Sequence, residues 1–197
     1  MSKIERDSLM TLEAYAKARP AFRARVLAHK KSRTLALGPN VTLIFEDELT
    51  IRYQIQEMLR VEKTFEEAGI QDELDAYNPL IPDGANWKAT MMIEFPDIEE
   101  RKRRLAEMRG VEHRVWARCG GLEPVPAIAD EDMERSNEDK TSAVHFLRFE
   151  LPAQMRTALR AGDAGGALSF GIDHDRYKAE VTVSPEVRAA LALDLAG

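Results

Sequence analysis

The order of strand-like and helix-like segments is the feature of this sequence that most narrows the folds open to it. Two β-rich runs flank residues 38–40, and residues 167–184 predict a second hairpin that turns at 173–175. Single strands are predicted at 87–95, 113–119 and 142–151. Helical segments separate these strands without a regular βαβ alternation. The sequence therefore predicts an α+β fold, a mainly antiparallel sheet packed with several helices in one compact domain.

The longest predicted helix runs from Thr11 to about Arg33, where alanine and other helix-favouring residues dominate. Pro20 lies inside this segment, which predicts a kink or two abutting helices. A second helix is predicted from about Leu49 to Ala68, with Gly69 as its C-terminal stop. Shorter helices or turns are predicted at 71–77, 97–109, 152–162 and 185–196.

Composition bounds the class of protein. The chain has 197 residues, enough to bury a sizeable core without disulfides or a structural metal. Its formal charge of −6 argues against nucleic-acid binding, which usually needs a basic surface that displaces counterions. Because Cys119 is the one cysteine, the chain forms neither an intrachain disulfide nor a four-cysteine zinc site.

The sequence also lacks membrane and export signals. No apolar run approaches the ~20 residues that a spanning helix needs, and the N-terminus lacks the apolar core of a secretory signal. We therefore expect a cytoplasmic protein without a membrane partner. Residues 120–142 combine glycines and prolines with a dense run of charges, which predicts a mobile, solvated loop.

The helix that begins near Leu49 has polar side chains within its apolar stripe. At about 100° per residue, the stripe consists of Ile51, Ile55, Met58, Val61 and Phe65. Gln54 and Glu62 fall inside it and Glu57 at its border, whereas the opposite, solvent-facing side carries Gln56, Arg60, Lys63 and Glu67. An unpaired buried carboxylate costs on the order of several kcal/mol. We expect Glu62 to reach water or an arginine; the alternative is that it lines a polar cavity as a metal ligand, acid or base.

Further polar groups lie where predicted elements end, a frequent place for site residues. Tyr77 and Asn78 stand at a helix-to-loop junction, and Glu94 is one residue from the end of a strand. The ligand-binding candidates are therefore Glu57, Arg60, Glu62, Tyr77, Asn78 and Glu94. Glu46 and Glu73 also lie where predicted elements end. They either belong to a cluster of carboxylates or are ordinary charges at the edge of the fold, and their spacing favours the second alternative.

Established catalytic and metal-binding patterns are missing from the sequence. Neither Glu57 nor Glu62 has a histidine three residues on, so the Glu-x-x-His pattern of ferritin-like di-iron sites is absent. The histidines lack metal-site spacing, and no glycine pattern matches a dinucleotide loop or a P-loop. The sequence thus assigns no metal or cofactor. The basic run from Arg19 to Arg33 is expected to be a solvated helix face, with an anion site or an acidic partner as alternatives.

Four segments of the sequence carry a resemblance to a known family. They are QEMLRVE, ELDAYNPLIP, ATMMIE and VHFLRFEL. The chain resembles, over nearly its whole length, a bacterial family of uncharacterised proteins catalogued as domain of unknown function 3501. Proteins of this kind are often encoded beside rubrerythrin-type di-iron proteins and iron–sulfur oxidoreductases. The resemblance therefore implies a redox partner and a role in peroxide handling or oxidative stress, but no activity and no catalytic residue.

Two functional hypotheses follow. In the first, the chain is an accessory cytoplasmic protein that acts with a di-iron or iron–sulfur redox partner, and binds that partner or a small ligand through the candidate residues. In the second, it is a metal-dependent enzyme with a carboxylate-rich pocket, in which Glu62 and Glu94 are ligands or acid–base groups. A substantial pocket lined by these two carboxylates is the minimum requirement of the second hypothesis.

Overall fold

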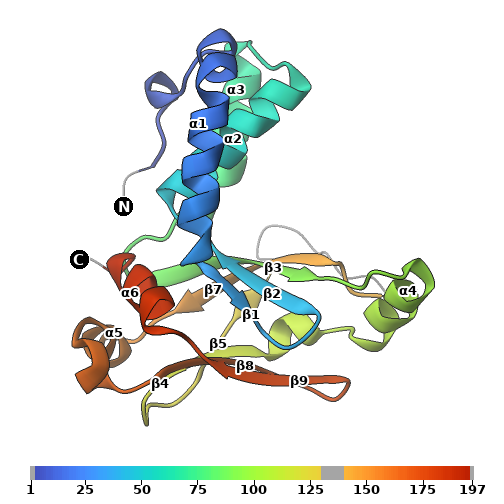
Figure 1. Cartoon of the computed structure of the whole chain (residues 1–197), viewed down its shortest axis with the longest axis vertical. Coiled ribbons are helices and arrows are strands. Elements are labelled where there is room, and N and C mark those ends of the chain that lie inside the picture. Colours follow the sequence, from blue (N-terminus) through green and yellow to red (C-terminus); the bar gives the residue numbers. More distant parts are fainter. Residues whose placement is uncertain (1–2, 130–139, 196–197) are drawn as a thin grey trace.

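Two antiparallel sheets and the helices around them account for residues 3–129 and 140–195, the part of the chain that the computed structural model describes (Figure 1). The larger sheet has the strand order β1-β2-β3-β7-β6, and the smaller sheet the order β5-β4-β8-β9. Neighbouring strands are antiparallel throughout the described pairs. The predicted α+β fold class and single compact domain are confirmed.

The bounds of the elements are as follows. The larger sheet contains β1 (Thr34–Ala36), β2 (Val41–Phe45), β3 (Asn86–Ile93), β6 (Ile128–Ala129) and β7 (Val144–Glu150). The smaller sheet contains β4 (Val115–Cys119), β5 (Val125–Pro126), β8 (Leu168–His174) and β9 (Tyr177–Thr182). The helices are α1 (Leu12–Lys31), α2 (Glu48–Glu62), α3 (Glu67–Tyr77), α4 (Ile98–Glu107), α5 (Ala153–Arg160) and α6 (Pro185–Leu193).

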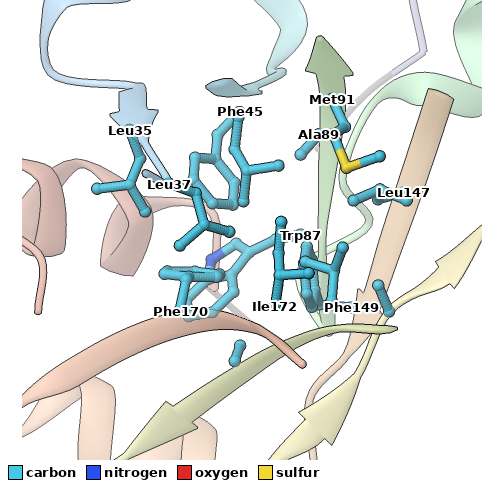
Figure 2. Close-up of a cluster of buried hydrophobic side chains, with 14 of the residues drawn as sticks. Leu35, Leu37, Phe45, Trp87, Ala89, Met91, Leu147, Phe149, Phe170 and Ile172 are labelled. Atoms are coloured by element: carbon cyan, nitrogen blue, oxygen red, sulfur yellow. The ribbon is translucent and has the colours of Figure 1, made fainter. Parts of the chain in front are cut away.

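An aromatic cluster fills the space between the two sheets (Figure 2). Phe45, Trp87 and Phe149 come from three strands of the larger sheet, and their ring centroids lie 5.0, 5.7 and 5.5 Å from that of Phe170 on β8. Such tilted and edge-on contacts contribute about 0.5–1.5 kcal/mol per pair beyond area burial. The Trp87 indole also donates to the carbonyl oxygen of Leu191 over 2.9 Å. The cluster therefore fastens α6 as well as both sheets.

The first three helices form a helical arm that stands on the larger sheet (Figure 1). The arm has its own apolar core, made of Ile4, Leu9, Ile51, Ile55, Leu59, Ile70, Leu74 and Ile81. Helix α1 buries Tyr15 and Val26 and is otherwise half-buried or exposed. The base of the arm meets the sheet, and its tip is the turn of residues 63–66 between α2 and α3.

Arg33, two residues after α1, ties the arm to the sheet and to the C-terminal helix. Its side chain is 2% exposed. The guanidinium donates to the carbonyl oxygens of Phe45 over 3.0 Å and Glu46 over 3.1 Å, at the end of β2. It also forms an ion pair with Asp194, the residue after α6. One buried cation thus holds three distant segments of the chain together.

Asp47 extends this network into α2. Its carboxylate caps the helix by accepting from the backbone N–H of Thr50 over 3.0 Å, and it lies 2.5 Å from the Nε2 atom of His29. Burial works to raise the pKa of Asp47, but Arg33 and the Thr50 N–H outweigh it and hold the pKa below its usual value. For Asp194, burial outweighs the pairing with Arg33 and raises the pKa to about 6.

Most predicted elements are present, with two corrections. The hairpin at 38–40 and the core face of the strand at 87–95 are confirmed. Helix α1 is continuous through Pro20, so the prediction of two abutting helices is wrong. Pro20 is exposed, which leaves the carbonyl that loses its helical partner accessible to water. Gly69 lies inside α3 and stops no helix.

Helix α2 ends at Glu62, six residues before the predicted end. Lys63 adopts the left-handed conformation with φ 57° and closes the helix without a glycine. The predicted apolar stripe includes Val61 and Phe65. These two side chains are instead 62% and 73% exposed at the tip of the arm. Phe65 lies beyond the end of the helix, where the helical wheel no longer applies, whereas Val61 lies within the last turn of α2.

The predicted loop of residues 120–142 is described only in part. Residues 125–129 form β5 and β6, by which the chain passes from the smaller sheet to the larger one. Residues 130–139 lie outside the described residues. Within the described ranges, no helix combines the length and apolar character needed to cross a membrane.

Replacing Arg33 by methionine should lower the free energy of unfolding by about 3–5 kcal/mol, because Asp194 and two strand-end carbonyls lose a buried partner. Urea unfolding at neutral pH measures the change. Arg23→Met removes an exposed arginine of α1 and should stay within about 0.5 kcal/mol of the unmodified chain. Equal effects of the two substitutions would contradict the role given to Arg33.

Candidate functional site

A cavity of about 280 Å³ lies where the helical arm meets the outer face of the larger sheet. The sheet contributes Ile44, Thr90, Met92, Val144 and Phe146, and the residue after β2 contributes Glu46. The arm contributes Lys30, Thr50, Ile51, Gln54, Tyr77 and Leu80. Concave, mostly apolar sites with a few convergent polar groups are the usual form of small-ligand pockets. This cavity is our candidate functional site.

Strand register builds the floor of the cavity. Ile44 on β2 lies opposite Thr90 on β3, which lies opposite Phe146 on β7. Met92 and Val144 form the next row that points the same way. Side chains alternate between the two faces of a strand, so the neighbours of these residues point into the aromatic core while these five face the arm.

Glu46 is the polar centre of the cavity. Its side chain is 7% exposed. The Thr50 hydroxyl donates to its Oε2 atom over 2.5 Å, and the Thr90 hydroxyl to its Oε1 atom over 2.7 Å. The Thr50 oxygen in turn accepts from the backbone N–H of Asp47 over 2.9 Å, and it lies 3.1 Å from the carbonyl oxygen of Asp47, a longer contact than that to Glu46. Both carboxylate oxygens are held in place, but no ion pair to Glu46 is present within residues 3–129 and 140–195.

Three further polar groups of the cavity are available to a ligand. Lys30, in the last turn of α1, forms no ion pair with any described residue, and it does not pair with Glu46. The Gln54 amide and the Tyr77 hydroxyl donate to and accept from no other group in the described part of the chain. All three side chains are half-buried. The cavity therefore offers a cation, an amide and a hydroxyl without partners among the described residues, beside a carboxylate that is hydrogen-bonded but forms no ion pair there.

Two other hollows adjoin this cavity. One of about 210 Å³ shares Leu80 and Phe146 with it and continues along the sheet to Lys88 and Arg148. A larger one of about 960 Å³ shares Met92 and Val144 and is wide open to solvent. Its wall includes Lys140, which borders residues 130–139. We place the candidate site at the cavity of about 280 Å³ because Glu46, Lys30, Gln54 and Tyr77 converge there.

Among the predicted site residues, Glu57 and Arg60 come together, in the arm and away from the cavity. The Glu57 carboxylate accepts from the Tyr15 hydroxyl over 2.7 Å and from Arg19 over 2.7 and 2.9 Å, and Arg60 lies 3.4 Å from it. These bonds join α1 to α2. Arg19, with Tyr15 and Arg60, lowers the pKa of Glu57 to about 2 against the opposing effect of burial.

Glu62 lies within the apolar stripe of the helical wheel but is exposed near the tip of the arm, which confirms the expectation that it reaches water and excludes the alternative that it lines a polar cavity. It forms no ion pair with an arginine of the described residues. Burial, the charge of Glu62 and that of Asp72 raise the pKa of Glu73. Glu94 is exposed just after β3 and lines the large open hollow. Because Glu62 ends α2 at the tip and Glu94 lies at the sheet, the two carboxylates do not share a pocket.

Tyr77 and Asn78, which are adjacent in sequence, have different roles. Tyr77 lines the cavity. The Asn78 side chain accepts from the backbone N–H of Ile4 over 2.8 Å and donates to its carbonyl oxygen over 3.1 Å. Asn78 therefore holds the N-terminal segment against the arm, and its amide is already satisfied.

Glu46, Thr50 and Thr90 line the cavity but are not among the site residues predicted from the sequence. The spacing favours a rim charge over a carboxylate cluster for Glu46, yet the residue is buried where the base of the arm meets this strand end. Gln54 was correctly placed on the inner side of its helix, whereas Gln56, predicted to face solvent, is buried and accepts from the backbone N–H of Met10 over 2.8 Å. A hydroxyl residue four positions after Glu46, at helical spacing, was the one signal available.

The acids and histidines of the described residues do not form a metal site. No group of three or more histidine, cysteine, aspartate or glutamate side chains in this part of the chain is arranged to hold a metal ion. Glu46 is joined by threonine hydroxyls instead of further carboxylates.

Comparisons with known proteins give a family but no activity. The model of the family described as "Protein of unknown function (DUF3501)" matches residues 3–195. A crystal structure of a novel protein of unknown function from Burkholderia pseudomallei is 54% identical, with a TM-score of 0.93; the match covers 99% of this chain and 100% of that one. None of the curated proteins matches.

Glu57→Gln should lower the free energy of unfolding at neutral pH by about 2–3 kcal/mol, because charge-assisted hydrogen bonds become neutral ones. The folded-state pKa of about 2 lies below the ordinary value of 4.5. The carboxylate's contribution is therefore full above about pH 4.5 and is lost as the pH falls toward 2. Urea unfolding across this pH range measures it.

The control for this prediction is Glu62→Gln, which alters an exposed carboxylate of the same helix. It should keep both the stability and the acid sensitivity of the unmodified chain. If Glu57→Gln lost as much stability between about pH 4.5 and 2 as the unmodified chain does, the Glu57 carboxylate would not be the group that joins α1 to α2.

Proposed function

We propose, from the premise that the chain belongs to the DUF3501 family, that it is a cytoplasmic accessory protein that binds a small ligand and acts with a redox partner. The ligand site is the cavity between the helical arm and the larger sheet. The observation that carries the proposal is Glu46, a carboxylate that is 7% exposed and faces this cavity without an ion-pair partner among the described residues.

A purely structural role explains Glu46 poorly. A buried carboxylate is costly unless it is paired, and two hydroxyl groups compensate it only in part. Glu57 shows the structural pattern in this protein, with a bidentate arginine and a phenol on one carboxylate. Glu46 has instead two oriented hydroxyls and an open side toward the cavity. This arrangement supports preorganisation for a ligand.

The metal-dependent enzyme has less support. That hypothesis needs Glu62 and Glu94 in one substantial pocket, but both side chains are exposed and they lie on separate parts of the molecule. Glu46 alone does not supply a metal's ligand set. Binding without chemistry accounts for the polar groups of the cavity with fewer requirements.

The partner half of the proposal comes from the resemblance, which implies a rubrerythrin-type or iron–sulfur protein. The tip of the arm offers a surface for it. Val61 and Phe65 are large apolar side chains with 62% and 73% exposure, the first in the last turn of α2 and the second in the turn before α3. Aromatic side chains of this kind are frequent anchors of protein interfaces.

Glu46→Gln should leave the ligand-free protein as stable as the unmodified chain, or up to about 1 kcal/mol more stable, because it removes an unpaired buried charge. Urea unfolding at neutral pH compares it with Glu57→Gln, which should be destabilising. The same Glu46 variant should lose the stabilisation that ligands from a metabolite library confer in a thermal-shift screen. Destabilisation as large as that of Glu57→Gln would make Glu46 structural.

Phe65→Ser should weaken binding to a purified rubrerythrin-type or iron–sulfur partner by at least about tenfold, because an anchoring aromatic is removed. Biolayer interferometry measures the affinity. Leu193→Ser removes a side chain of α6 that is 76% exposed and should leave the affinity unchanged. Equal affinities of the unmodified chain, Phe65→Ser and Leu193→Ser would show that the partner does not bind at the tip of the arm.

A further inference from the structure

Two opposite charges line the cavity without neutralising each other. Glu46 stands at the sheet side, with its two oxygens fixed by threonine hydroxyls. Lys30 stands at the arm side, in the last turn of α1. No ion pair joins them, and neither has another ion-pair partner among the described residues. A ligand that carries one charge would leave the other uncompensated.

The size and lining of the cavity narrow the ligand further. Its volume of about 280 Å³ lies at the small end of the range of ligand pockets, about 300–1,000 Å³. That is too little for a nucleotide or a large cofactor. The apolar floor of Ile44, Met92 and Phe146 favours a hydrocarbon body, and the Gln54 amide and Tyr77 hydroxyl can hydrogen-bond the polar groups of a ligand.

We infer that the cavity takes a small apolar zwitterion, a free amino acid with a hydrocarbon or thioether side chain. The ammonium group binds the Glu46 carboxylate and the carboxylate binds the Lys30 ammonium. Both charged groups are attached to the same carbon, and the side chain extends from that carbon over the apolar sheet residues of the cavity. This inference rests on the proposed ligand-binding function and adds the chemical class of the ligand.

The arrangement of donors agrees with this assignment. The Thr50 and Thr90 hydroxyls already donate to Glu46, so the free lone pairs of that carboxylate accept from a donor-rich group, and an ammonium has three donors. Lys30 is half-buried on a flexible stem and can follow a carboxylate at the edge of the cavity. A zwitterion satisfies both side chains and adds no net charge to the site.

The test uses L-leucine and L-methionine together with two truncated analogues of leucine. 3-Methylbutylamine lacks the carboxylate, and 4-methylpentanoate lacks the ammonium. Isothermal titration calorimetry on the full chain at neutral pH should show binding of at least one amino acid, with each truncated analogue at least about tenfold weaker. The amino acid should also raise the melting temperature.

Two substitutions separate the two ends of the ligand. Glu46→Gln should reduce the affinity for leucine to that for 4-methylpentanoate, and Lys30→Met should reduce it to that for 3-methylbutylamine. Lys31→Met changes the exposed neighbour of Lys30, which does not line the cavity, and should leave the affinity unchanged. Circular dichroism confirms that each variant is folded.

The outcomes distinguish this inference from the proposed function. If the amine binds as tightly as the amino acids, or if neither amino acid binds while library compounds do so in a Glu46-dependent way, the zwitterion is wrong and the ligand-binding function stands. If no compound binds and Glu46→Gln is as destabilising as Glu57→Gln, both proposals fall.

Discussion

The buried guanidinium of Arg33 is the interaction on which the other parts of the molecule depend. A cation that is 2% exposed needs acceptors on every side. The chain supplies them from the end of β2, from the cap of α2 and from the residue after α6. These segments are far apart in sequence, so satisfying one side chain fixes where the arm, the sheet and the C-terminal helix meet.

The candidate site follows from that junction. Because Arg33 binds the carbonyl oxygens of Phe45 and Glu46, the chain turns directly from β2 into α2, with Asp47 as the cap. The turn places the Glu46 side chain on the outer face of the sheet and Thr50 above it, one helical turn further on. The network that stabilises the fold on one side of this turn thus presents an incompletely compensated carboxylate on the other.

Local patterns in the sequence predicted the elements well and the site poorly, for a physical reason. Alternation in the strand at 87–95 and the hairpin signal at 38–40 depend on neighbouring residues alone, and both are confirmed. The end of α2 depends on Lys63 adopting a left-handed conformation, and the sequence has no glycine at this position that would indicate it. The burial of Glu46 depends on the arm folding back over the sheet, a contact between distant segments. Glu62 lies in the apolar stripe of the helical wheel but is exposed where α2 ends. Glu46 is buried by a contact that the spacing along the chain does not contain.

Helix α2 connects the two halves of the proposed function. Its first turn carries Thr50 and, one turn later, Gln54 at the cavity, and its last turn carries Val61 at the tip of the arm. A ligand between Glu46 and Lys30 contacts the sheet and the arm at once, so it restricts the arm relative to the sheet. A helix moves as a rigid body over this length of about 22 Å, at 1.5 Å per residue. Under the proposed function, this one element couples the occupancy of the cavity to the orientation of the apolar tip, as an accessory protein that senses a small molecule and acts on a partner requires.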